Sequence, residues 1–80
     1  TMGMTSGWLS QASAERFITE QRDSFDDLFC PHCVEAISTL KCKMGNELVF
    51  CIVVVFDGDT KHFITEADVR FMTGEQTYVI

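Results

Sequence analysis

Residues 47–56 read ELVFCIVVVF, and this run constrains the fold more than any other part of the chain. It contains five Val and Ile residues and neither Gly nor Pro, which is typical of a β-strand. Side chains alternate between the two faces of a strand, and here both alternating sets are apolar. Such a strand must be covered on both sides. In a chain of 80 residues, a second copy of the protein is one source of that second cover.

Helical patterns precede this strand. Apolar residues between Ala14 and Phe29 recur at the spacing of one helix face, which predicts a helix over about 10–22 followed by a short turn at 25–29. Pro31 is favoured at the first position of a helix. The apolar stripe that follows predicts a second helix from residue 31, which Gly45 ends.

The strand is followed by a turn signal and a third helix. Asp57-Gly58 predicts a hairpin into a strand over 60–64. Thr65 and Asp68 then have the spacing of a helix cap, which predicts a helix over 66–72 that Gly74 ends. Residues 77–80 are short and β-branched and predict a last strand. We therefore expect an α+β fold in which N-terminal helices pack on a small antiparallel sheet, with a flexible segment at 1–7 and a single domain over 8–80.

Charge and hydropathy exclude several classes of function. The chain has 12 acidic and 6 basic residues, and a net charge of −6 disfavours binding to nucleic-acid phosphates or to an anionic membrane. The longest apolar run, residues 48–56, is far shorter than the roughly 20 residues that a membrane-spanning helix needs. The first residues lack the pattern of a signal peptide. We therefore expect a cytoplasmic protein with reduced thiols.

Cysteines supply the one chemical signal in the sequence. Cys30 and Cys33 are separated by two residues, the spacing of a redox dithiol and of a zinc knuckle. Together with the preceding Phe29, the tetrapeptide resembles the active site of the DsbA class of thioredoxin-fold oxidoreductases, which implies thiol–disulfide exchange with Cys30 at a helix N-terminus. The resemblance covers only these residues, because helical residues precede the motif where that fold has a strand.

A zinc site is the second interpretation of the same pair. A helix over 31–42 would hold Cys33 and Cys42 about 13 Å apart, so four cysteines could not share one ion. The predicted hairpin instead places His62 on the same face as Cys51. The candidate ligands for Zn²⁺, the one cofactor considered, are Cys30, Cys33, Cys51 and His62. The simpler interpretation is that the cysteines are thiols without a ligand, buried like small apolar residues.

Two features are candidates for contact with a protein partner. Trp8 lies outside the helical stripe, either folded onto the core or exposed as an anchor. The densest acidic cluster in the chain would suit a basic partner and consists of Glu20, Asp23, Asp26 and Asp27. Asp57-Gly58-Asp59 opens like a calcium loop, but no series of ligands follows, so it predicts a turn.

No catalytic set stands out in the sequence. We therefore expect a small acidic, non-enzymatic protein-interaction module that regulates or inhibits a larger protein, with a homodimer as one arrangement. Compact acidic chains of this type suit modulators encoded by viruses or mobile elements. The alternatives are a zinc-stabilised module built on Cys30 and Cys33, and a thiol–disulfide oxidoreductase that uses the same pair.

Overall fold

The computed structural model describes residues 4–74, which form three helices and three strands. The helices are α1 (Gln11–Glu20), α2 (Arg22–Leu28) and α3 (Glu66–Thr73). The strands are β1 (Ala36–Met44), β2 (Glu47–Asp57) and β3 (Thr60–Phe63). Their order along the chain is α1-α2-β1-β2-β3-α3, which confirms the predicted α+β class. The last strand expected, at 77–80, lies outside the described residues.

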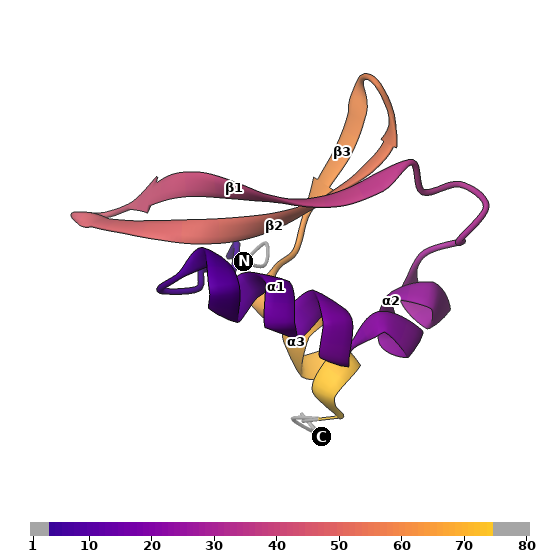
Figure 1. Cartoon of the computed structure of the whole chain (residues 1–80), viewed down its shortest axis with the longest axis horizontal. Coiled ribbons are helices and arrows are strands. Elements are labelled where there is room, and N and C mark those ends of the chain that lie inside the picture. Colours follow the sequence, from indigo (N-terminus) through magenta and orange to yellow (C-terminus); the bar gives the residue numbers. More distant parts are fainter. Residues whose placement is uncertain (1–3, 75–80) are drawn as a thin grey trace.

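The sheet is antiparallel with the order β1-β2-β3, so the apolar strand β2 is central. The helices lie on one side of the sheet (Figure 1). An N-terminal segment runs along the β3 side of β2 and forms isolated bridges from Thr5 to Thr65 and from Trp8 to Phe50. The backbone N–H of Trp8 donates to the Phe50 carbonyl at 2.8 Å, and the Phe50 N–H donates back to the Trp8 carbonyl.

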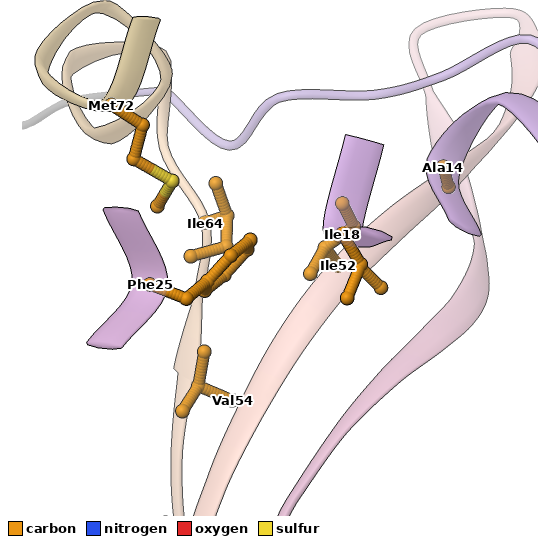
Figure 2. Packing of buried hydrophobic residues seen from close by; sticks show 7 residues of the cluster. All are labelled: Ala14, Ile18, Phe25, Ile52, Val54, Ile64 and Met72. Atoms are coloured by element: carbon orange, nitrogen blue, oxygen red, sulfur yellow. The ribbon is translucent and has the colours of Figure 1, made fainter. Parts of the chain in front are cut away.

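The core lies between the helices and one face of β2 (Figure 2). Every helix contributes at least one buried side chain, and Phe25 is only 1% exposed. Its ring is turned toward Ile64 in the segment between β3 and α3 (Figure 2). The cluster consists of Ala14, Ile18, Phe25, Ile52, Val54, Ile64 and Met72. Because these residues come from both ends of the chain, the core joins the N-terminal helices to α3.

Local hydrogen bonds set the helix ends, and those of α3 are the ones that the sequence predicts. Ser10 caps α1, because its side chain accepts from the Ser13 backbone N–H at 3.1 Å. At α3, the side chains of Thr65 and Asp68 each accept from the backbone N–H of the other, which is a complete capping box. Gly74 ends this helix in the left-handed region, with φ of 79°.

The N-terminal helical region is divided differently from the prediction. α1 ends at Glu20, and a second short helix, α2, occupies the place of the expected turn. The break falls at Gln21, whose ψ of 23° departs from helical geometry. A tertiary contact orients α2, since Ser24 Oγ donates to the Met72 carbonyl of α3 at 3.2 Å.

The helix predicted from residue 31 is wrong. Residues 31–33 form a turn, and residues 36–44 form β1, which pairs with β2 along its whole length. Pairing with β1 satisfies the backbone N–H and C=O groups on one edge of β2. These hydrogen bonds join residues that are distant in the sequence, so the local helical pattern does not indicate them. Gly45 does not end a helix but forms a two-residue hairpin turn with Asn46, and its φ of 60° suits a type II′ turn.

The hairpin between β2 and β3 has the predicted turn but a shifted register. Asp57 pairs with Thr60, and an irregularity between Val55 and Asp57 adds one residue to β2. His62 consequently pairs with Val54 rather than with Val53 or Val55. A shift of one residue moves a side chain to the other face of the sheet, so His62 lies on the face opposite Cys51, where the prediction placed both together.

Candidate functional site

The face of the sheet that points away from the helices has no helix or strand over it among residues 4–74 (Figure 1). We call it the outer face. Its members follow from the register, because side chains alternate and Ile52 and Val54 point to the core. The outer face consists of Ala36, Ser38, Leu40, Cys42 and Met44 of β1, Glu47, Val49, Cys51, Val53 and Val55 of β2, and Lys61 and Phe63 of β3.

The outer face is apolar, with exposed side chains at its margins. Val49, Cys51 and Val53 along its centre are buried, whereas Leu40 is 48% exposed and Phe63 is 36% exposed. A shallow hollow of about 330 Å³ lies at one side of the centre. It is lined by Thr5, Cys42, Lys43, Met44, Cys51 and Phe63. Two of the six exposed large apolar side chains of residues 4–74, Leu40 and Phe63, therefore lie on the outer face. An apolar patch of this kind is a candidate surface for contact with another protein.

A pair of thiols lies within the outer face. Cys42 and Cys51 lie diagonally across β1 and β2 on the same face, because Cys42 pairs with Val49, two residues before Cys51. Burial raises the pKa of the Cys51 thiol to about 12. The hydrogen bond with Cys42 and the negative charge of the Cys42 thiolate act in the same direction. Cys51 therefore stays a neutral thiol and behaves as an apolar residue of the strand.

The second thiol pair lies in the loop between α2 and β1. The Cys33 backbone N–H donates to the Cys30 carbonyl at 2.9 Å and closes a turn that leaves both side chains exposed. A hydrogen bond from the Cys33 thiol, joined by the backbone N–H groups of His32 and Cys33, lowers the pKa of the Cys30 thiol. The same hydrogen bond raises the pKa of the Cys33 thiol. The helix N-terminus predicted for Cys30 is absent, so the turn itself favours the thiolate.

A hollow of about 200 Å³ lies beside this turn, between α2 and the start of β1. Its lining is mixed, with two aromatic rings and three charged side chains. The lining residues are Arg22, Phe25, Asp26, Phe29, Pro31, Val34, Glu35, Ala36 and Ile37. Because Phe29 and Pro31 flank Cys30, a peptide side chain held in this hollow would lie close to the dithiol.

The structure does not bring the four candidate zinc ligands together. Cys30 and Cys33 share the turn before β1, Cys51 lies on the outer face, and His62 points to the helical side. There His62 Nε2 lies 2.8 Å from Asp68 Oδ2, and its ring is 5.3 Å from that of Phe29. Within residues 4–74, no three His, Cys, Asp or Glu side chains are grouped closely enough to hold a metal ion.

The candidate partner residues fall into two places. Trp8 is partly buried, and its ring packs on that of Phe17 with centroids 5.0 Å apart, so it contributes to the core. The four acidic residues are exposed on the last turn of α1 and on α2, and they are Glu20, Asp23, Asp26 and Asp27. Asp26 also borders the hollow beside the dithiol.

Sequence reasoning missed the exposed residues of the outer face, above all Leu40 and Phe63. The helical spacing of the apolar residues after Pro31 predicts a helix with Leu40 on its apolar stripe, whereas the structure places Leu40 on β1. The signal that could have placed it is Gly45-Asn46, a two-residue hairpin turn between two runs of strand length. With that turn recognised, Leu40 falls opposite Cys51 in the register.

Compared with models of known protein families, with curated proteins and with solved structures, the chain matches none of them. In the part of the chain that the structure describes, no helix is both long enough and apolar enough to cross a membrane.

Proposed function

We propose that this chain is a small non-enzymatic protein-interaction module and that the outer face is its binding surface. The observation that carries the proposal is an apolar sheet face that no helix or strand of residues 4–74 covers, with Leu40 and Phe63 exposed on either side of the buried row on β2. Burying apolar surface contributes about 25 cal/mol per Å², so the exposed parts of Leu40 and Phe63 would gain free energy when a partner covers them.

The acidic residues of α1 and α2 supply a second contact region in this proposal. Asp23, Asp26 and Asp27 are exposed on α2 and lie on the helical side of the molecule, away from the outer face. Clustered negative charge accelerates encounter with a basic surface and excludes acidic ones. A module of this kind would regulate or inhibit a larger protein that carries a basic surface.

The test is site-specific photo-cross-linking from the two faces of the β1–β2 hairpin. Leu40 on the outer face and Leu48 on the helical side are both exposed leucines, so they form a matched pair. Benzoylphenylalanine in place of Leu40 should give an adduct with one defined protein, identified by mass spectrometry. The same label in place of Leu48 should not. The binding constant of the identified protein should then weaken by about tenfold or more in Leu40→Glu and stay unchanged in Leu48→Glu.

Two results would contradict the proposal. One is the absence of any adduct at position 40, and the other is equal labelling from positions 40 and 48. Thermal unfolding of each variant serves as the folding control, since a lost fold would also abolish binding. An adduct from position 40 alone supports the outer face whichever protein it contains.

A second candidate function, thiol–disulfide exchange, is favoured by the turn that holds Cys30 and Cys33 in hydrogen-bond contact. Residues that close a β-turn have Cα atoms within about 7 Å, a separation that allows a disulfide. The Cys30 thiolate would attack a disulfide of a substrate protein and release one substrate thiolate. Cys33 would then lose its proton to solvent and attack Cys30 Sγ, which releases the second thiolate. The chain ends with a Cys30–Cys33 disulfide, and the substrate gains two electrons.

Trapping with oxidised glutathione tests this candidate. In Cys33→Ser the first step has no resolving thiol, so a stable glutathione adduct should accumulate on Cys30. The unmodified chain should instead lose two mass units and carry an internal disulfide. If Cys30→Ser exchanges with glutathione as fast as the unmodified chain does, the dithiol turn is not the reacting site.

A further inference from the structure

By the strand register, the outer face carries two charged side chains, and they lie at opposite ends of it. Lys43 borders the hollow, but its register position is on the helical side. Glu47 begins β2 beside the turn to β1, and Lys61 lies next to Val55 near the turn to β3. Counted along β2, Glu47 is four residues before Cys51 and Val55 is four residues after it. Both charged positions therefore lie about 13 Å from Cys51 along the strand direction, at about 3.3 Å per residue. The face has zero net charge although the whole chain carries −6.

From this pattern we infer that a second copy of this chain occupies the outer face, with the strands of the two copies antiparallel and a two-fold axis passing across β2 at Cys51. The inference rests on the proposed function, because it names the partner of the same surface. Rotation about that axis reverses positions along β2, so Glu47 of one copy meets Lys61 of the other. The parallel arrangement would place equal charges opposite each other, and this disfavours it.

The geometry also favours contact through faces over contact through edges. β1 is an edge strand of the sheet that residues 4–74 form, and Lys41 and Lys43 are exposed along it. Lysines on an edge strand oppose the pairing of two edges, because two copies would bring like charges together. On the outer face, Leu40 lies beside Cys51 at the level of the axis, so the exposed leucines of the two copies would meet.

The size of the face indicates a weak dimer. Nine residues of β2 and three strands span about 27 Å by about 14 Å, or about 400 Å² of sheet per copy. A standard stable interface buries about 800 Å² per partner. We therefore expect a dissociation constant in the micromolar range. A dimer of that strength leaves the helical side of both copies free for the larger partner.

Sedimentation equilibrium of the full chain between about 5 and 500 µM tests the inference. The unmodified chain should show a monomer–dimer equilibrium. Leu40→Glu should weaken it by about tenfold or more, whereas Leu48→Glu, the matched change on the other side of the hairpin, should leave it unchanged. A chain that stays monomeric over the whole range would overturn the inference, as would a dimer that both variants form equally well.

A charge exchange tests the antiparallel orientation without touching an apolar side chain. Glu47→Lys and Lys61→Glu should each weaken the dimer by about threefold to tenfold, because each places like charges opposite one another. The double variant should restore the dissociation constant to that of the unmodified chain. Absence of rescue would exclude this arrangement, and unaltered dimerisation in both single variants would exclude it too.

These results separate the inference from the proposed function. If the chain is monomeric while position 40 cross-links to a different protein, the inference of a second copy is wrong, but the proposed interaction function stands. If the chain is monomeric and position 40 forms no adduct, both are wrong. An adduct with the mass of two chains, together with rescue by the charge exchange, supports both.

Discussion

The fold gives the thiols of Cys30 and Cys51 different environments. Cys30 is exposed, and hydrogen bonds lower its pKa, whereas Cys51 is 1% exposed, with a pKa of about 12. Only the thiolate reacts with alkylating reagents. The sequence placed both residues in one candidate metal set, but the fold separates the exposed turn from the strand interior.

Alkylation with iodoacetamide near neutral pH should therefore modify Cys30 first and Cys51 last. Peptide mass spectrometry at successive times measures the order, and the same reaction in urea is the control, since unfolding should equalise the sites. Modification of Cys51 in the folded chain as fast as Cys30 would mean that the outer face is not packed as described.

The carboxylate of Asp68 contacts both the start of α3 and the side chain of His62. Its Oδ2 accepts from the Thr65 backbone N–H at 3.0 Å and lies 2.8 Å from His62 Nε2. Burial raises the pKa of Asp68, but the hydrogen bonds from Thr65 and His62 outweigh it and hold the pKa below its usual value. A lowered folded-state pKa stabilises the fold above the unfolded pKa, and this stability is lost as the pH falls through the folded value.

We expect Asp68→Asn to lower the free energy of unfolding by about 1 kcal/mol near neutral pH, since it removes a charged cap at the start of α3. The difference from the unmodified chain should begin to shrink below about pH 4, where the unfolded carboxyl group takes up protons, and should disappear only below the lowered folded-state pKa of Asp68. Urea denaturation of both chains, near neutral pH and well below about pH 4, measures this difference in the free energy of unfolding. A difference that is the same at both would show that the charge of Asp68 does not contribute.

At the scale of elements, the two hairpins turn by different means. Gly45 needs a positive φ of 60°, whereas Gly58 is not among the glycines with positive φ. The second turn is held instead by Asp57, whose Oδ1 accepts from the backbone N–H groups of Asp59 and Thr60 at 3.1 Å. These two backbone hydrogen bonds lower the pKa of Asp57. One hairpin therefore depends on a glycine, and the other on a side-chain acceptor.

Gly45→Ala should destabilise the chain by about 1–2 kcal/mol, because an L-residue is strained at that φ. Gly58→Ala is the control, as both positions have open space around an added Cβ. It should leave the free energy of unfolding unchanged or raise it by a few tenths of a kcal/mol. Equal effects in urea denaturation would show that the strain at Gly45 is not what sets the β1–β2 turn.

For the whole molecule, the separation of the thiol pairs bears on stability. No three potential ligands are grouped within residues 4–74, and the core is formed by seven apolar side chains. We expect the thermal midpoint to be the same with and without EDTA, and the Cys30→Ser, Cys33→Ser double variant to keep that midpoint. A midpoint that falls on chelation and recovers with Zn²⁺ would restore the zinc-stabilised module.

The sequence by itself determined the parts of the fold that depend on contacts within about four residues or on one long apolar run. The cap at Thr65, the helix end at Gly74 and the strand β2 follow from such local signals. It also predicted that β2 has two apolar faces, and so led to the outer face. Each of these features is specified by neighbours in the chain.

Only the tertiary structure decided the conformation of residues 31–44 and the face on which His62 lies. β1 is a strand because β2 offers it nine paired positions, although Leu40 and its neighbours also fit a helix stripe. His62 faces the helices because one extra residue in β2 shifts the register. Both outcomes depend on hydrogen bonds between strands, which a local pattern does not encode, and they decide which side chains form the outer face.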